Sequence, residues 1–216
     1  MKMIIGGVEE AGRGPVIGPM VIAIAVINEE DEFKLKALGV KDSKLLTPSQ
    51  RERLYNEIKD LCEYELIKVG PEEIDNAVNS KDTNLNWLEA DKAVILINKL
   101  RPDKVILDCP STNLREYKKY IQSKLEYQPK LVVEHKADVK YAIVGAASIL
   151  AKVCRDKEIK KLKAKYKVDF GSGYPSDPLT VEFTKRYYDK YPFFRQSWET
   201  WQKAKKLGGQ RKLEDF

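Results

Sequence analysis

The amino-acid sequence predicts an α/β fold, in which helices flank a mixed five-stranded sheet and a small helical appendage follows. Three short apolar runs come early in the chain, and two more alternate with segments of helical periodicity. After the fifth run only helical patterns follow. This order of elements is typical of a sheet covered by helices, with the last helices packed at one end.

The expected strands are short runs rich in apolar residues, at 2–9, 16–28, 64–69, 105–107 and 130–134. The run Val105-Ile106-Leu107 is apolar throughout, which is typical of a strand buried on both faces. The expected helices carry apolar residues at helical spacing, at 48–61, 83–100, 113–126, 138–165, 179–190 and 196–207. Thr47 and Pro48 form a start signal for the first helix.

Composition indicates a folded intracellular protein with an anionic partner. The 216 residues include 43% hydrophobic residues, which are enough to fill a core. Lys and Arg outnumber Asp and Glu by 39 to 33, and this modest excess favours a polyanion such as nucleic acid. The three cysteines form no CxxC pair, which excludes a typical zinc site, and no apolar stretch approaches the ~20 residues that span a bilayer. We therefore expect a cytoplasmic location.

The N-terminal strand leads into two adjacent carboxylates, Glu9 and Glu10, and a Gly12-Arg13-Gly14 turn follows at once. Carboxylate oxygens hold hard metal ions, and a glycine turn brings backbone amides close to an anionic ligand. Together they predict metal-dependent chemistry on a phosphate backbone. Because consecutive strand residues point to opposite faces, both glutamates can serve one site only if the strand ends or bulges there. Two solvated glutamates are the ordinary alternative.

Two aspartates extend this prediction. Asp108 ends an apolar run, although an aspartate before Pro110 is also an ordinary turn residue. On a helix beginning at Asp138, Ser148 and Lys152 share its face, so one helix would present a carboxylate, a hydroxyl and an ammonium. The alternative is an amphipathic helix with a solvated side.

His135 is the only histidine of the chain. A single histidine excludes a His-rich zinc site and argues against a Ser-His hydrolase. Carboxylates without histidine partners favour Mg²⁺ or Mn²⁺. Two such ions can activate a water and stabilise a leaving oxygen in phosphodiester cleavage.

At this point the sequence resembles the ribonuclease HII family in its archaeal-length form. Four motifs stand in the family's order: Glu9-Glu10-Ala11-Gly12-Arg13-Gly14, Lys41-Asp42-Ser43-Lys44, Glu134-His135-Lys136-Ala137-Asp138 and Gly171-Ser172-Gly173-Tyr174-Pro175-Ser176-Asp177. Leu107-Asp108 and residues 146–152 add to the match. Each motif alone is weak, whereas the set is specific.

The resemblance implies a ribonuclease H-like fold with a catalytic domain at 1–170, a helical region packed on it at 171–207, and a flexible tail at 208–216. It implies an endonuclease that hydrolyses RNA in RNA–DNA hybrids. It also implies incision on the 5′ side of single ribonucleotides in duplex DNA, leaving 3′-hydroxyl and 5′-phosphate ends. Such an enzyme serves DNA replication and ribonucleotide excision repair, and we expect it to act as a monomer.

The resemblance also assigns roles to residues of this chain. Catalysis and the binding of two Mg²⁺ or Mn²⁺ ions would fall on Glu9, Glu10, Asp108 and Asp138. Reading of the 2′-hydroxyl at the RNA–DNA junction would fall on Gly12, Arg13, Gly14 and Tyr174. A backbone-lined turn can bond this hydroxyl, and an aromatic ring can stack on the neighbouring sugar or base. Backbone phosphates would be held by Lys44, Ser148 and Lys152.

One position departs from the family pattern, which has aspartate where this chain has Glu9. The extra methylene adds about 1.5 Å of side-chain length, whereas metal–ligand distances tolerate only about 0.2 Å. Three interpretations stay open: the strand shifts to compensate, the enzyme is natural but slower, or the chain is an altered variant.

The C-terminal residues Gln210, Leu213 and Phe216 match the pattern Gln-x-x-Leu-x-x-Phe. This pattern resembles the peptide by which replication and repair enzymes dock on the sliding clamp, in which a helical turn inserts apolar anchors into a pocket. Leu213 and Phe216 are three residues apart and share a face of such a turn. A solvated tail is the alternative.

Two other functions remain open at this stage. One is another nuclease of the same fold, such as a junction resolvase, against which the pairing of the Gly-Arg-Gly turn with Tyr174 argues. The other is a catalytically impaired hybrid-binding protein, which Glu9 makes plausible. Trp198 and Trp201 are interpreted as packing residues.

Overall fold

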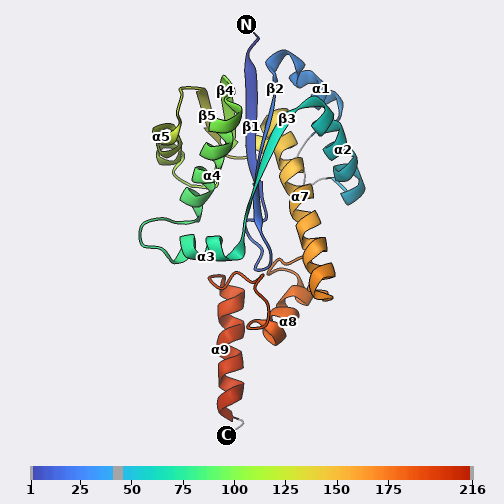
Figure 1. Ribbon diagram of the computed structural model, residues 1–216, viewed down its shortest axis with the longest axis vertical. Coiled ribbons are helices and arrows are strands. Elements are labelled where there is room, and N and C mark those ends of the chain that lie inside the picture. Colours follow the sequence, from blue (N-terminus) through green and yellow to red (C-terminus); the bar gives the residue numbers. More distant parts are fainter. Residues whose placement is uncertain (1, 41–45, 215–216) are drawn as a thin grey trace. The chain divides into compact units, whose positions relative to one another are not determined.

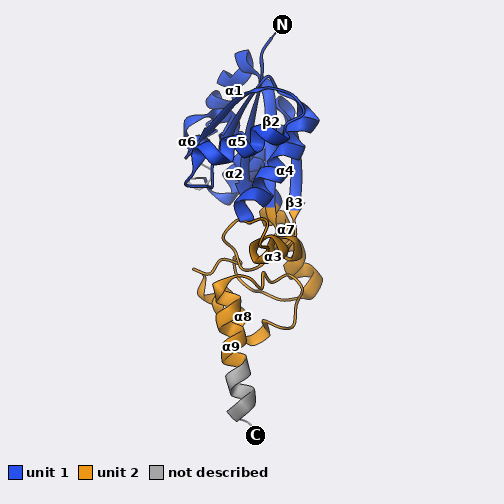
Figure 2. Cartoon of the chain, turned by 90° about the vertical axis from the view of Figure 1, so that its left-hand side faces the viewer, with its two compact units in different colours: residues 1–11, 21–68, 85–154 blue, residues 12–20, 69–84, 155–216 orange. Residues whose placement is uncertain are grey.

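The computed structural model describes the backbone of residues 2–40 and 46–214, and the side chains of these ranges as far as residue 208. The chain divides into two compact units (Figure 2). Unit 1 comprises Met1–Ala11, Val21–Lys68 and Leu85–Cys154. Unit 2 comprises Gly12–Met20, Val69–Asn84 and Arg155–Phe216. The units are interleaved along the chain and differ in their segments from the predicted domains, whose boundaries stay a prediction.

Unit 1 contains the sheet. Within the described residues, five strands lie in the order β3-β2-β1-β4-β5. Their bounds are β1 Ile4–Ala11, β2 Met20–Asn28, β3 Glu63–Val69, β4 Lys104–Asp108 and β5 Lys130–Glu134. β1 pairs antiparallel with β2 and parallel with β4, and β4 pairs parallel with β5. The predicted mixed five-stranded sheet is confirmed.

Helices cover both faces of this sheet (Figure 1). In unit 1 they are α1 Glu32–Ala37, α2 Pro48–Leu61, α4 Leu85–Leu100, α5 Leu114–Lys124, α6 Ala137–Lys140 and the first part of α7 Ala142–Tyr166. Figure 1 places α4 and α5 on one face and α1, α2 and α7 on the other. The start signal of α2 is confirmed, because Thr47 and Gln50 form a reciprocal capping box.

The core of unit 1 forms between β1, β2 and the helices α2 and α7. Alternate strand residues supply it, including Val21, Ala23 and Ala25 of β2, which are all fully buried. Helix α7 is buried almost all round over its first ten residues. It owes this burial to Gly7 of β1, where an added Cβ would lie 2.6 Å from the amide nitrogen of Val144. The helix backbone therefore rests directly on the strand.

Unit 2 is built around aromatic residues. Its helices are α3 Pro71–Asn79, the second part of α7, α8 Pro178–Tyr187 and α9 Glu199–Glu214. Phe170, Phe183 and Phe193 pack together with ring centroids 5.2 to 6.3 Å apart, a range in which aromatic pairs attract. Val16 and Ile17 join the same cluster.

Several expected boundaries differ in the structure. The second strand begins at Met20 and not at residue 16, because Gly18 has a φ of 87° and the preceding residues pack in unit 2. The helix expected over 196–207 begins at Glu199, and its backbone stays helical to Glu214. The short helices α1 and α3 were not expected from the sequence, since each carries fewer than one buried side chain per turn.

The helix expected from Asp138 to residue 165 is interrupted, which corrects the sequence-based prediction. Tyr141 is extended, with φ −119° and ψ 120°, and separates α6 from α7. Its hydroxyl donates to a carboxylate oxygen of Glu134 at 2.9 Å, which holds the break against β5. Asp138 therefore lies on α6, and it does not share a helix face with Ser148 and Lys152 of α7.

None of the helices in the described residues has the length and apolarity that crossing a bilayer requires.

The contact between Gly7 and α7 yields a stability prediction. Gly7→Ala would place a methyl group against the backbone of Ile143 and Val144, which cannot rotate away. We expect a loss of about 3 kcal/mol in the free energy of unfolding, measured by urea denaturation. Gly70→Ala is the control, because an added Cβ there meets nothing within 4 Å. That change should cost less than about 1 kcal/mol, the effect of alanine at a helix N-cap. Equal losses in the two variants would contradict the proposed close packing.

Candidate active site

Four carboxylates of unit 1 gather where β1 and β4 stop pairing. The last paired residues are Val8 of β1 and Leu107 of β4, and Glu9 and Asp108 follow them directly. An Oδ1 of Asp108 accepts a hydrogen bond from the backbone N–H of Ala137 at 3.0 Å, which ties the start of α6 to the end of β4. Asp138, the next residue, is 5% exposed. The structure therefore brings together the end of β4, the part of β1 that lies beyond its pairing with β4, and one short helix.

The two glutamates do not meet the expected condition of a strand end or a bulge. β1 continues to Ala11 in regular antiparallel register, with Glu9 opposite Ala23 and Glu10 opposite Ile22. What ends after Val8 is the pairing of β1 with β4. The two side chains point to opposite faces of β1, and both lie beyond the last residue of β1 that pairs with β4.

Glu9 carries the clearest electrostatic signal of the site. Its side chain is buried, and its Oε2 has no hydrogen-bond partner among the described residues. Burial raises the pKa of Glu9 well above its usual range, and the charges of Glu10, Asp108 and Asp138 raise it further. Glu10, Asp108 and Asp138 therefore lie close enough to Glu9 for their charges to disfavour its ionisation.

This cluster fits a hard divalent cation in its chemistry. It offers only carboxylate oxygens, and one of them is buried without a protein donor. No three Asp, Glu, His or Cys side chains in the described part of the chain already have the spacing of a metal cage. The assignment of ligands accordingly stays a prediction. His135 is exposed, and its Nδ1 lies 3.0 Å from the carbonyl of Cys109.

The turn into α6 contains the one strained backbone at this site. Lys136, the N-cap of α6, has φ 57° and ψ 38°, the left-handed conformation that costs a non-glycine residue free energy. Such strain persists only where the surroundings fix it, and here Asp108 does so by bonding the next amide.

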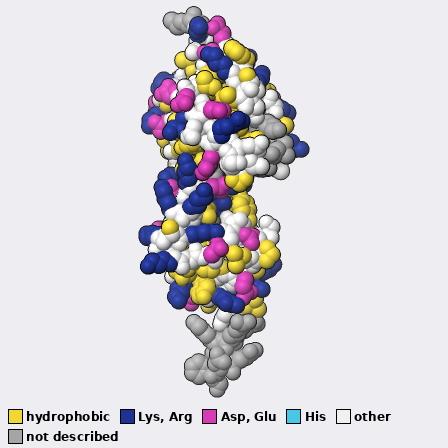
Figure 3. Space-filling view, turned by 90° about the vertical axis from the view of Figure 1, so that its right-hand side faces the viewer, with side chains coloured by type: hydrophobic (Ala, Val, Ile, Leu, Met, Phe, Trp, Pro, Cys, Tyr) yellow, Lys and Arg dark blue, Asp and Glu magenta, His cyan; other side chains and the backbone are white. Residues whose placement is uncertain are grey.

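Ser148 and Lys152 lie one turn apart on α7 in unit 1. Ser148 is 5% exposed and Lys152 is half-buried. Beyond this point α7 continues in unit 2 as a lysine-rich surface, with Lys157, Lys160 and Lys161 exposed. Figure 3 shows Lys and Arg gathered on the face that carries this helix. The surface is suited to a polyanion.

The Gly12-Arg13-Gly14 turn belongs to unit 2, together with Tyr174. Gly12 has a φ of 81°, and an added Cβ would lie 2.9 Å from the carbonyl of Pro19. At Gly14 an added Cβ would lie 3.9 Å from Cε1 of Tyr174, so the ring adjoins the turn. The guanidinium of Arg155 lies 5.0 Å from the centre of the same ring. The structure thus brings the two predicted recognition elements together.

Three residues that surround this turn were missed by the sequence analysis. Arg155 and Arg195 are 2% and 0% exposed. Asp75 of α3 accepts hydrogen bonds from the backbone amides of Gln196 and Ser197 at 2.8 and 2.9 Å. The only local sequence feature that could have pointed to a buried role for Arg195 is its position directly after Phe193 and Phe194. No neighbouring residue in the sequence indicates the role of Asp75.

Other predicted site residues lie elsewhere or outside the described residues. Lys44 is among the residues that the structure does not describe, as are Phe216 and the side chains of Gln210 and Leu213. Trp201 is buried and donates its Nε1–H to the carbonyl of Tyr188 at 2.7 Å, as expected of a packing residue.

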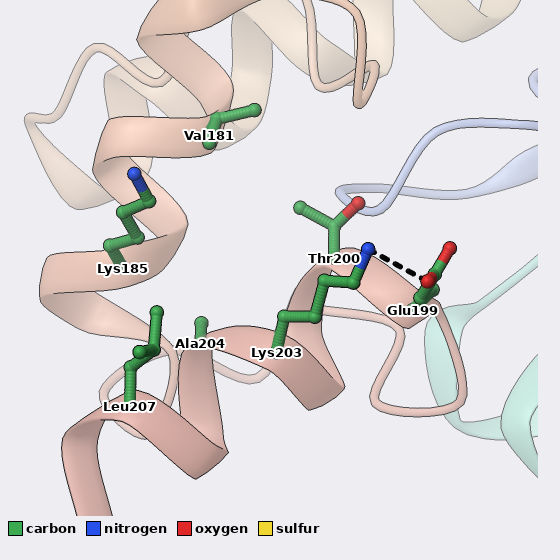
Figure 4. A pocket seen from close by; sticks show the side chains of 7 residues that line it. All are labelled: Val181, Lys185, Glu199, Thr200, Lys203, Ala204 and Leu207. Atoms are coloured by element: carbon green, nitrogen blue, oxygen red, sulfur yellow. Dashed lines mark ion pairs between the residues drawn. The ribbon is translucent and has the colours of Figure 1, made fainter. Parts of the chain in front are cut away.

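A separate pocket of about 270 Å³ lies between α8 and α9 (Figure 4). Its lining residues are Val181, Lys185, Glu199, Thr200, Lys203, Ala204 and Leu207. Lys203 is paired with Glu199 at 2.7 Å across its rim. None of the predicted site residues lines it.

Comparison with known proteins identifies the family. The sequence profile of ribonuclease HII matches residues 6–201, which is most of the chain. The chain belongs to the ribonuclease HII family. It is 49% identical over 205 residues to the ribonuclease HII of Pyrococcus horikoshii, which covers 92% of this chain and 91% of the relative.

Two solved structures agree with this assignment. The crystal structure of the ribonuclease H2 from Pyrococcus horikoshii OT3 matches with a TM-score of 0.87 at 47% identity, and covers 95% of this chain and 98% of that one. The ribonuclease HII in a PCNA:RNase HII complex from Archaeoglobus fulgidus matches with a TM-score of 0.83 at 38% identity, and covers 91% and 96%. This chain is thus a type HII ribonuclease H, an endonuclease that acts on RNA–DNA hybrids, in a divalent-metal-dependent family.

The raised pKa of Glu9 predicts how stability changes with pH when divalent ions are removed. A carboxyl whose pKa is raised by folding stabilises the fold at low pH, and this contribution is lost as pH rises from about 4.3, the usual glutamate value, through the raised pKa. Glu9→Gln cannot ionise. We expect its free energy of unfolding to match that of the native chain near about pH 4 and to exceed it by about pH 8.

Urea denaturation in the presence of a chelator measures this difference. Glu63→Gln, which alters an exposed carboxylate of β3, is the matched control for the substitution itself and is measured at the same two pH values. A gap for Glu9→Gln that is the same at both pH values would contradict the raised pKa.

Proposed function

We propose that this ribonuclease incises duplex DNA on the 5′ side of single embedded ribonucleotides, leaving a 3′-hydroxyl and a 5′-phosphate. The observation that carries the proposal is the pairing, within unit 2, of Gly14 and the ring of Tyr174. A backbone amide close to an aromatic ring suits a single ribose, because the amide can bond its 2′-hydroxyl while the ring stacks on the neighbouring sugar or base.

The carboxylates Glu9, Glu10, Asp108 and Asp138 would hold two Mg²⁺ or Mn²⁺ ions. The supporting observations are the orphaned Oε2 of Glu9 and the neighbouring carboxylate charges that help to raise its pKa. When bound, the ions supply activation of water and stabilisation of the leaving oxygen. The protein's own contribution is to fix the oxygens on β1, on the end of β4 and on a helix that Asp108 caps.

The substrate would be positioned by side chains that contact its phosphates and do not read its base sequence. Ser148, Lys152 and Lys44 would contact backbone phosphates, and the lysines of α7 would extend this attraction along the duplex. We further propose that the enzyme acts as a monomer in the cytoplasm, in the repair of ribonucleotides left by DNA replication.

Cleavage of three matched duplexes tests this function. The three substrates are a DNA duplex with one ribonucleotide, the same duplex without a ribonucleotide, and a DNA four-way junction. Each is incubated with the protein and Mg²⁺ or Mn²⁺. We expect cutting of the first alone, with the stated ends. Cutting of the junction would indicate a resolvase, and binding without cutting that Glu9→Asp restores would indicate an impaired site.

Substitutions of the carboxylates test the metal site in the same assay. Asp108→Asn and Asp138→Asn should each lower kcat by at least about 100-fold, because each replaces a carboxylate that would hold a metal ion by a neutral amide. Glu63→Gln should leave kcat unchanged. The readout besides activity is the rise in Tm on adding Mn²⁺, which the two asparagine variants should lose. Retention of this rise in both would contradict their role as ligands.

We also propose that the C-terminal peptide docks on a sliding clamp. The Archaeoglobus fulgidus relative has been solved in a complex with PCNA. In this chain α9 remains helical to Glu214, so the backbone already has the turn on which Gln210 and Leu213 would be presented.

Deletion of residues 210–216 should abolish binding to a purified archaeal sliding clamp and leave cleavage of short duplexes intact. Leu213→Ala should reproduce the loss, because it removes an apolar anchor, whereas Lys212→Ala, between the anchors, should not. Calorimetry measures both. Full clamp affinity in the truncated chain would refute the proposal.

A further inference from the structure

Arg195 is a fully buried arginine that donates to three backbone carbonyls of one loop. Its Nε–H bonds the carbonyl of Gly18 at 3.0 Å, its Nη1 that of Arg13 at 2.8 Å and its Nη2 that of Gly12 at 2.6 Å. The partners lie 177 to 183 residues away in the chain. A planar guanidinium is the only side chain with a fork of donors that can reach three carbonyls at once.

Trp198 completes this contact. Its Nε1–H donates to the carbonyl of Gly14 at 2.9 Å, and the guanidinium of Arg195 lies 4.8 Å from the centre of its ring. All three carbonyls of the Gly12-Arg13-Gly14 turn therefore accept hydrogen bonds from the segment 195–198. The cation also gains attraction from the face of the indole.

Because the peptide bond is planar, holding the carbonyls of the turn also fixes the directions of its amide N–H groups. A trans peptide directs its carbonyl and the following N–H in opposite directions. Because the carbonyls of Gly12 and Arg13 are held by Arg195, the amides of Arg13 and Gly14 point to the other side of the turn. Gly14 is exposed and adjoins Tyr174, whereas Gly12 is buried. Two consecutive amides thus point away from the anchoring side chains, and the second belongs to Gly14, the residue of the turn that adjoins the ring.

The segment 195–198 is itself held in place by hydrogen bonds within unit 2. Asp75 accepts from the amides of Gln196 and Ser197 and from the Ser197 hydroxyl, at 2.5 to 2.9 Å. The amide of Arg195 donates to the carbonyl of Val16 at 2.8 Å. Arg195 and Trp198 accordingly have little freedom to follow a moving turn.

We infer that Arg195 and Trp198 are positioning residues for ribose recognition: by holding the carbonyls of the Gly-Arg-Gly turn, they present its amides to a 2′-hydroxyl. The inference rests on the proposed role of that turn. It predicts that weakening either anchor reduces the preference for a ribonucleotide, while the affinity for an all-DNA duplex, which depends on phosphate contacts elsewhere, is retained.

Binding in a chelator, where cleavage does not interfere, tests the inference. Fluorescence anisotropy gives Kd for a duplex with one ribonucleotide and for the same duplex in DNA alone, and their ratio is the discrimination. Arg195→Lys keeps the positive charge but removes the forked set of N–H donors. It should lower the discrimination about tenfold, which is the effect of one hydrogen bond to a charged group. Trp198→Phe keeps a ring and removes one donor, and should lower it by a smaller factor.

Arg186→Lys is the matched control, because Arg186 is an exposed arginine of α8 in the same unit, paired with Glu182. It should change neither Kd. A purely structural role of Arg195 would instead lower Tm and weaken both duplexes together, so that the ratio stays constant. That result, or an unchanged ratio in both Arg195→Lys and Trp198→Phe, would overturn the inference. If Arg195→Lys fails to fold, the ratio for Trp198→Phe decides.

The native chain separates this inference from the function on which it rests. A native protein that binds both duplexes equally would refute the proposed ribose reading by the turn. A native preference for the ribonucleotide that survives in both variants would refute only the role of Arg195 and Trp198.

Discussion

The direct contact between β1 and α7 at Gly7 is the constraint on which unit 1 depends. Without a Cβ at this position, the backbone of α7 lies against the strand, and the first turns of the helix become part of the core. Gly7 and Glu9 are two residues apart and share a strand face. The same close packing that buries α7 therefore removes Glu9 from water, and burial is the largest cause of its raised pKa.

Burial and the charges of the neighbouring carboxylates both disfavour ionisation of Glu9. Carboxylates that repel one another destabilise the fold when all are ionised, and a divalent cation reverses the sign of that interaction. The extra methylene of Glu9 acts at a buried position. Because Glu9 lies opposite fully buried Ala23 in regular register, β1 shows no local bulge by which the longer side chain would be withdrawn. Any adjustment falls on side-chain torsions.

The sequence predicted the sheet and the candidate carboxylates because both follow from local patterns. Apolar runs that stop at Asp108 or lead into Glu9 mark strands and their ends without any knowledge of their neighbours. The break in the helix at Tyr141 was not predicted, because the segment from Asp138 onward keeps a helical spacing of apolar residues. The break is held by a hydrogen bond from the Tyr141 hydroxyl to Glu134, which that spacing does not indicate. The roles of Arg195 and Asp75 could not be predicted from the sequence. Their hydrogen-bond partners lie 121 to 183 residues away in the chain, and the periodicity of the sequence carries no information on contacts of that kind.

Arg195 of unit 2 and Glu9 of unit 1 are both buried charged groups, and they differ in how they are bonded. Burying a charge is costly unless the charge is bonded, and the three guanidinium nitrogens of Arg195 bond carbonyls of its own unit. In the role proposed for the Gly12-Arg13-Gly14 turn, these bonds would hold it in place before substrate binds, so little conformational entropy would be lost when a ribose docks. Glu9, by contrast, has an oxygen that no described residue of the protein satisfies. The chain passes from one kind of site to the other across the single peptide bond between Ala11 and Gly12. The turn that we propose reads ribose thus begins three residues after Glu9, which we propose as a metal ligand, and this adjacency in the chain would couple recognition to cleavage.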